Sequence, residues 1–182
     1  MPSTALKNDT PLPAFMFASD ACLEGGGSHF MSDWMYTSWV CDYPELVDSH
    51  INVLELFTVF LALVRWGSAL SGSHVIIRSD NSVTIAALNK ATSRGVEIMP
   101  IVRNIFWLCI KYDICVTGLF IPGKLNVLAD NISRLHNVFS ANCARLTIAD
   151  FNVCKLVACK GHMSERAYML LQDAWTLGSR NY

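Results

Sequence analysis

The sequence contains no uninterrupted apolar stretch of the roughly 20 residues that a membrane-spanning helix requires. Its longest apolar stretch runs from Val53 to Trp66 and is interrupted by Glu55, Thr58 and Arg65. The polar residues 1–13 also lack the apolar core of a signal peptide. We therefore expect an intracellular protein, cytoplasmic or nuclear, with no membrane partner.

Charged residues are also scarce, at 16% of the chain, and the formal net charge is −1. Without a global positive field, the protein must bind any nucleic acid through a local basic patch or through bridging metal ions. By contrast, 52% of the residues are hydrophobic, and the mean hydropathy is +0.33. Since no membrane segment accounts for this excess, we expect an exposed apolar face that contacts neighbouring protein.

The seven cysteines form no CxxC pair and show no zinc-binding spacing, and the histidines show no metal-binding spacing either. Most of the cysteines stand beside apolar residues. This favours small buried side chains in a reducing compartment, with metal and disulfide roles as the alternatives.

Short apolar runs bounded by turn residues predict five strands. They fall at 14–18, 28–31, 35–40, 74–78 and 114–121. The first three strands form an antiparallel meander, and Gly25, Gly26 and Gly27 predict the turn between its first two strands.

Apolar residues at helical spacing predict four helices. They fall at about 53–70, 81–89, 96–111 and 126–135. Asn52 is predicted to be the N-cap of the first helix. A meander followed by β-α-β units predicts an α/β domain that has a mixed sheet with helices on both faces.

Two aspartates, Asp20 and Asp80, each follow a serine at the end of a predicted core strand. Sites in open α/β sheets form outside the carboxyl ends of strands, so we expect these carboxylates to lie a few ångströms apart. Adjacent carboxylates repel each other unless a divalent cation lies between them, and oxygen-rich sites favour Mg²⁺ or Mn²⁺.

Glu55, in the first turn of the long helix, and Asp130, near the start of the last helix, are placed to complete a set of four acids around two cations. Such a pair of ions can cut a phosphodiester by in-line displacement. Each acid alone also suits a cap or a turn, so the joint pattern is what points to a metal site.

Four segments that contain these acids resemble the ribonuclease H domain of retrotransposon reverse transcriptases, in particular those of DIRS-type elements. The segments are FASDA, INVLELFTVFLAL, IIRSDNSVTIAALN and IPGKLNVLADNISR, and the resemblance covers about residues 14–135. It implies a ribonuclease H-like fold with a five-stranded mixed sheet in the order 3-2-1-4-5. The four metal-binding acids of the family match Asp20, Glu55, Asp80 and Asp130.

The resemblance also implies two Mg²⁺ ions, for which Mn²⁺ can substitute, and endonucleolytic hydrolysis of the RNA strand of an RNA–DNA hybrid during reverse transcription. The hybrid is distinguished by its 2′-hydroxyl groups in the minor groove. The residues expected to contact it are Asn52, Asn81, Lys124, Asn126 and Arg134.

Two features depart from the family. The loop from Pro122 to Asn126 has no histidine of the kind that many cellular ribonucleases H carry there. Residues 89–100 contain only Lys90 and Arg94, where some members have a basic helical protrusion. We therefore expect weak substrate binding by the isolated domain, which would depend on an attached reverse transcriptase domain.

The domain boundaries follow from this match. Residues 1–13 are expected to form an arm or linker, 14–135 the ribonuclease H domain and 136–182 a C-terminal extension. Residues 164–182 resemble the start of the core-binding domain of a tyrosine recombinase, which lies downstream in DIRS-type elements. The alternative is an amphipathic helix that packs back on the nuclease sheet.

Two other functions stay open. A catalytically idle ribonuclease H-like module would serve as a structural or interaction domain, in a retroelement polyprotein or in a domesticated host protein. Integrases and resolvases share the fold and use strand-end acids on DNA. The position of Glu55 in the first long helix favours ribonuclease H over these DNA enzymes.

Overall fold

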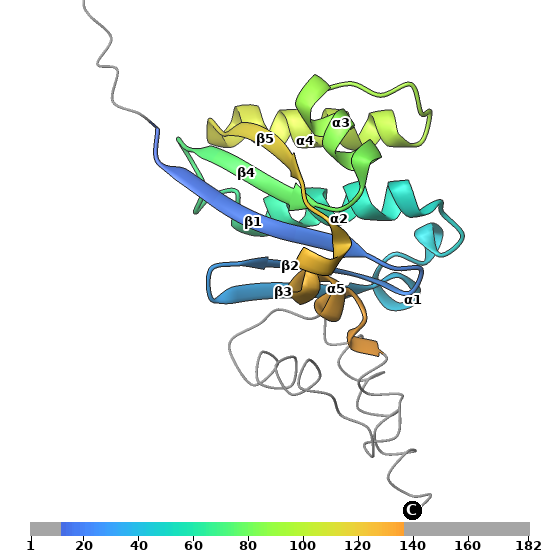
Figure 1. The fold of residues 1–182 in the computed structure, drawn as a ribbon. Coiled ribbons are helices and arrows are strands. Elements are labelled where there is room, and N and C mark those ends of the chain that lie inside the picture. Colours follow the sequence, from blue (N-terminus) through green and yellow to red (C-terminus); the bar gives the residue numbers. More distant parts are fainter. Residues whose placement is uncertain (1–11, 137–182) are drawn as a thin grey trace, which may run out of the picture.

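The computed structural model describes residues 12–136, which form a five-stranded sheet covered by helices (Figure 1). Its order is β3-β2-β1-β4-β5, so the predicted order 3-2-1-4-5 is confirmed. The strands are β1 (Ala14–Ala21), β2 (Gly25–Phe30), β3 (Asp33–Ser38), β4 (His74–Ser79) and β5 (Cys115–Phe120). The first three strands are antiparallel, whereas β4 runs parallel to both β1 and β5. Residues 1–11 of the predicted arm and residues 137–182 of the predicted C-terminal extension lie outside the described residues.

The helices lie on both faces of this sheet, as predicted. They are α1 (Trp39–Asp42), α2 (Ile51–Trp66), α3 (Ser82–Lys90), α4 (Ile98–Tyr112) and α5 (Val127–Ser133), with 3₁₀ turns η1 (Pro44–Leu46) and η2 (Gly123–Leu125). Helices α2, α3 and α4 share one hydrophobic core, and α5 packs on β2 from the opposite face. Within residues 12–136, no helix has the length and apolar character needed to cross a membrane.

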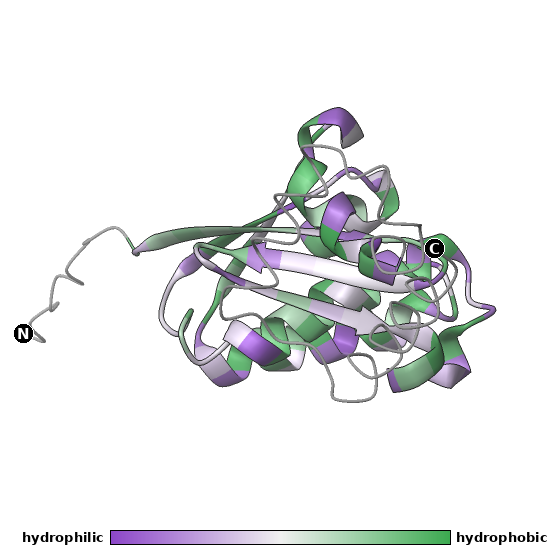
Figure 2. Cartoon of the chain, turned by 90° about the horizontal axis from the view of Figure 1, so that it is seen from below, coloured by the Kyte–Doolittle hydropathy of each residue, from purple (hydrophilic) through white to green (hydrophobic). Residues whose placement is uncertain are grey.

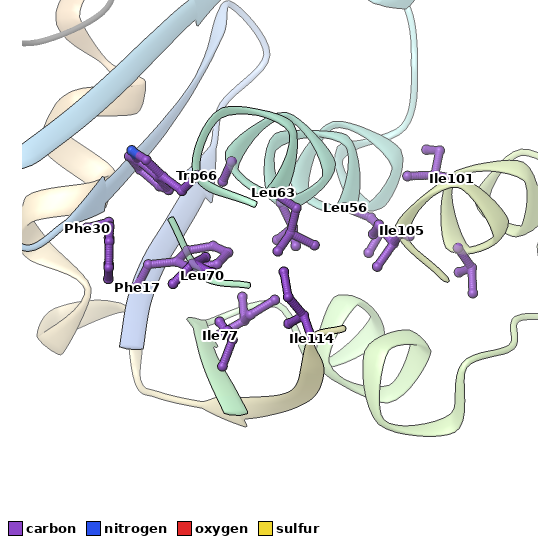
Figure 3. Close-up of a cluster of buried hydrophobic side chains, with 14 of the residues drawn as sticks. Phe17, Phe30, Leu56, Leu63, Trp66, Leu70, Ile77, Ile101, Ile105 and Ile114 are labelled. Carbon is purple, nitrogen blue, oxygen red and sulfur yellow. The ribbon is translucent and has the colours of Figure 1, made fainter. Parts of the chain in front are cut away.

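The main core lies between α2 and the sheet, and α4 extends it beside α2 (Figure 3). Leu56 and Leu63 of α2 are fully buried, and each side chain contributes about 1.5–3 kcal/mol through its removal from water. The ring of Trp66 packs against those of Phe17 and Phe30, with centroid distances of 5.6 and 5.7 Å. This core fixes α2, and therefore Glu55, against the sheet.

Contacts at both ends hold α2 in place. At its N-terminus the cap is His50, whose Nδ1 accepts a hydrogen bond from the Asn52 backbone N–H at 3.1 Å. The prediction that Asn52 is the N-cap is therefore wrong, because the helix begins one residue before Asn52. At its C-terminus, Asp33 accepts hydrogen bonds from Arg65 and from the Trp66 indole.

Helix α2 ends at Trp66 rather than at the predicted Leu70. The apolar periodicity continues past the helix because Leu70, in the following turn, is still fully buried in the core. The backbone N–H of Leu70 bonds to the carbonyls of Trp66 and Gly67, which closes a turn instead of continuing the helix.

The glycine triplet forms the start of strand β2, so its predicted role as a turn is wrong. A Cβ on Gly27 would collide with the backbone nitrogen of Ser133 and with Ile132, both in α5. A Cβ on Gly26 would collide with Thr58 of α2 on the other face. The glycines are required because helices approach this strand closely from both sides. That close approach seats α5 directly over the end of β1.

Helix α4 exposes three large apolar side chains, Phe106, Trp107 and Ile110, to about half or more of their full extent. Phe106 and Ile110 also line an apolar groove of about 360 Å³ between α3, α4 and β5. In Figure 2, hydrophobic segments are spread over strands and helices rather than gathered in one stretch. The excess of hydrophobic residues is therefore partly on the surface.

Candidate active site

Three of the four predicted acids converge at one end of the sheet. Asp20 lies in β1, Asp80 directly follows β4, and Glu55 lies in the second turn of α2. One carboxylate oxygen from each of these acids lies within 4.8 Å of the other two. The parallel pairing of β1 with β4 brings the first two acids together, as strand-end chemistry predicts.

Burial makes this cluster electrostatically costly without a cation. Asp20 and Glu55 are only 5% and 4% exposed. Burial, reinforced by the charge of Asp80, raises the pKa of Asp20 to about 7 and the pKa of Glu55 to about 9. Hydrogen bonds oppose the rise only in part: Ser133 donates to Asp20, and Ser79 and the Ala21 backbone interact with Glu55.

The donor set fits a hard divalent cation. It consists only of carboxylate oxygens, which Mg²⁺ and Mn²⁺ prefer over nitrogen or sulfur ligands. Glu55 Oε2 is buried and has no hydrogen-bond partner among the described residues. A buried carboxylate oxygen without a partner is costly, and a cation would remove that cost.

Asp130 lies outside the group of three. Its Oδ1 accepts a hydrogen bond from Arg134 Nε at 2.7 Å, and its side chain is 41% exposed. It is nevertheless close enough for its charge to raise the pKa of Asp20. The neighbouring Ser133 donates a 2.6 Å hydrogen bond to Asp20 Oδ2, so α5 is tied directly to the buried acids.

The predicted substrate-contacting residues surround these acids in different ways. Asn81 caps α3, and its Nδ2 donates to Asn52 Oδ1 at 2.9 Å, which links the starts of α3 and α2. Lys124 and Arg134 are exposed. Asn126 is only 2% exposed, and its Nδ2 donates to the Ser19 carbonyl at 3.0 Å. Asn126 therefore anchors the start of α5 to β1.

Sequence reasoning missed two residues that shape the site. Ser133 orients Asp20, and only the folded chain shows this contact because the two residues are 113 positions apart. Gly123 lies over Asp80, where an added Cβ would stand 2.6 Å from Asp80 Oδ2. The Pro122-Gly123 pair after β5 is typical of a turn. It does not indicate that a side chain at position 123 would press on a carboxylate of the site.

The raised pKa of Glu55 predicts that stability falls with rising pH when no divalent cation is present. Between pH 7 and 9 the folded state binds more protons than the unfolded state, in which Glu55 has its ordinary value of 4.5. Unfolding free energy should then drop by about 2 kcal/mol over this window. His29 and His136, whose pKa values are lowered by burial, act in the opposite sense only below pH 6.5.

Urea unfolding at pH 7 and pH 9 in a chelator measures this slope. Glu55→Gln should flatten it, and saturating Mg²⁺ should also flatten it by stabilising the ionised acids. Equal stability of the wild-type chain at both pH values would contradict the assignment.

The comparisons with known proteins add little to this geometry. No protein-family model and no curated protein matches the sequence. Among solved structures, the chain is similar to a ribonuclease H1 isolated from compost by a metagenomic approach, at 14% sequence identity and a TM-score of 0.42. That match covers 65% of this chain and 90% of the other. The sheet order and the converging acids therefore carry the functional argument.

Proposed function

We propose that this chain is a ribonuclease H that cuts the RNA strand of an RNA–DNA hybrid endonucleolytically during retrotransposon reverse transcription. The observation that carries the proposal is the convergence of Asp20, Glu55 and Asp80 within 4.8 Å on a sheet of order β3-β2-β1-β4-β5. Asp130 lies on α5, which is hydrogen-bonded to β1, and completes the proposed set of metal-binding acids.

In this proposal, two Mg²⁺ ions, or Mn²⁺ in their place, supply an activated water and stabilise the attacking and leaving oxygens of the phosphodiester. Asp20, Glu55 and Asp80 provide the buried carboxylates that hold a cation, and Ser133 fixes the orientation of Asp20. Asp130 is more exposed and carries its carboxylate at the outer side of the site, where Arg134 orients it. The protein thereby positions several carboxylates whose ionised forms a bound cation would stabilise.

The residues around the acids suit a hybrid partner. Asn52 and Asn81 are joined by a hydrogen bond at the starts of α2 and α3. Asn81 directly follows Asp80, and Asn52 lies about one helical turn before Glu55. Amides can both donate to and accept from a 2′-hydroxyl group, which distinguishes RNA from DNA. Lys124 and Arg134 are exposed cations suited to phosphate contacts.

Few basic side chains accompany this site, so we propose that affinity for the hybrid comes partly from an attached reverse transcriptase domain. The apolar surface of α4, with Phe106, Trp107 and Ile110, supports a protein neighbour of this kind. A tyrosine recombinase in the parent polyprotein stays part of the proposal, because residues 164–182 resemble the start of its core-binding domain.

A substrate panel tests the activity. With Mn²⁺ present, the chain should cut the RNA strand of a hybrid and leave duplex DNA and duplex RNA intact, and a chelator should stop the reaction. Cleavage of duplex DNA would instead favour the chemistry of integrases and resolvases. Calorimetry addresses the idle module, since failure to bind Mn²⁺ at millimolar concentration would favour a purely structural role.

A further inference from the structure

A second group of metal-ligating side chains lies on the α5 side of the sheet and has no part in the proposed nuclease chemistry. Cys22, Glu24 and His136 each offer one ligand atom, and the three atoms lie within 4.8 Å of one another. His136 Nε2 lies 3.8 Å from Glu24 Oε2. This group has no local signature in the sequence, because its members are up to 114 positions apart and follow no zinc-binding spacing.

The fold holds Cys22 in place. Cys22 is buried, its backbone N–H bonds to the Gly25 carbonyl at 2.8 Å, and its carbonyl accepts from the Trp39 indole at 2.9 Å. Its Sγ donates to the Ser133 carbonyl at 3.2 Å, at the end of α5. The thiol therefore faces the C-terminal end of α5, where His136 follows. Cys22 therefore needs little reorganisation to bind a metal.

His136 and Glu24 complete a suitable donor set. Nδ1 of His136 is buried and has no hydrogen-bond partner among residues 12–136. Glu24 is exposed and is free to rotate by the short distance that metal–ligand bonds of about 2.0–2.3 Å require.

We propose that Cys22, Glu24 and His136 bind one Zn²⁺ ion, which clamps the β1–β2 turn to the end of α5. A sulfur, a nitrogen and an oxygen ligand suit this borderline-soft ion, whereas the all-carboxylate cluster suits Mg²⁺ or Mn²⁺. Binding replaces the thiol proton, which is released to solvent, and the fourth tetrahedral position is left to water. Since α5 carries Ser133, the ion stabilises the helix that orients Asp20.

Co²⁺ is the probe of choice because a thiolate ligand gives it an intense charge-transfer band in the near ultraviolet, which carboxylates do not. The full chain should show this band at one Co²⁺ per molecule, and Zn²⁺ should displace it. Cys22→Ser should abolish the band, and His136→Gln should weaken Co²⁺ binding by at least about 10–100-fold, the loss typical of even outer-shell substitutions. The exposed Glu24 provides Glu24→Gln as a variant that does not disturb the core and should also weaken binding.

Two controls separate this site from the others. Cys115→Ser, an exposed cysteine on β5, should keep the band, and so should Asp80→Asn in the acid cluster. At one fixed Zn²⁺ concentration, the Tm of the wild-type chain should rise more than the Tm of Glu24→Gln. Absence of a thiolate band in the wild-type chain, or its persistence in Cys22→Ser, would overturn the proposal. Neither result bears on whether the acid cluster cuts a hybrid.

Discussion

Asp80→Asn should abolish hybrid cleavage, with a loss of at least about 100-fold in rate, because even the outer-shell partners of metal ligands contribute 10–100-fold. The amide has nearly the same shape as the carboxylate but loses the charge that a cation needs. Asp80 follows β4 without being fully buried, so the fold should tolerate the change. The measurement is single-turnover cleavage of a labelled hybrid in Mn²⁺.

The same substitution should stabilise the metal-free chain. The charge of Asp80 raises the pKa of both Asp20 and Glu55, which means that it opposes their ionisation. Its removal relieves this repulsion, so Tm in a chelator should rise while the stabilisation by Mn²⁺ disappears. A variant that is more stable and inactive is the signature of a functional acid cluster.

Asp48→Asn is the matched control, because Asp48 is exposed in the loop before α2. It should keep both the cleavage rate and the response to Mn²⁺. Hybrid cleavage by Asp80→Asn at the wild-type rate would rule out the proposed chemistry.

Gly27→Ala should destabilise the domain by about 1–3 kcal/mol and reduce cleavage, because an added methyl group overpacks the contact between β2 and α5. The methyl group would meet the backbone of Ser133 and Ile132, which cannot rotate away as a side chain can. Displacement of α5 moves Ser133 away from Asp20 and carries Asp130 with it. Urea unfolding and the cleavage assay measure the two effects.

Gly95→Ala provides the control for this prediction. A Cβ on Gly95 would meet only the side chain of Ile98, at 3.3 Å, so both stability and activity should stay close to wild type. A Gly27→Ala chain that unfolds at the wild-type urea concentration would show that α5 does not press on β2 as described.

Much of the fold could be predicted from local patterns. The strands around Phe17, Ile77 and Gly118 and the helix around Leu56 follow from apolar runs and periodicity, and the strand-end position of Asp20 and Asp80 follows from the same patterns. The antiparallel meander and the β-α-β units then limit the sheet to few orders.

The wrong predictions have a common physical cause: at these positions, tertiary contacts outweigh the local preferences of the residues. Three consecutive glycines favour a turn by local preference, but the closeness of α5 and α2 makes them the only residues that fit in β2. Likewise, Asn52 has a better capping side chain in general, but its Oδ1 accepts a hydrogen bond from the distant Asn81. His50 instead accepts the hydrogen bond from the Asn52 backbone N–H. The partnership of Ser133 with Asp20 joins distant parts of the chain and has no local signature.

The way α5 docks on the sheet also has a consequence for synthesis on the ribosome. The bond from Asn126 to Ser19 spans 107 positions and the bond from Ser133 to Asp20 spans 113, so β1 makes these two contacts only after α5 has been synthesised. Closing such a long loop costs conformational entropy, which is offset only when α5 makes its contacts with the sheet. A growing chain therefore displays three acids without the helix that aligns them. The acid site is completed only after α5 has left the ribosome.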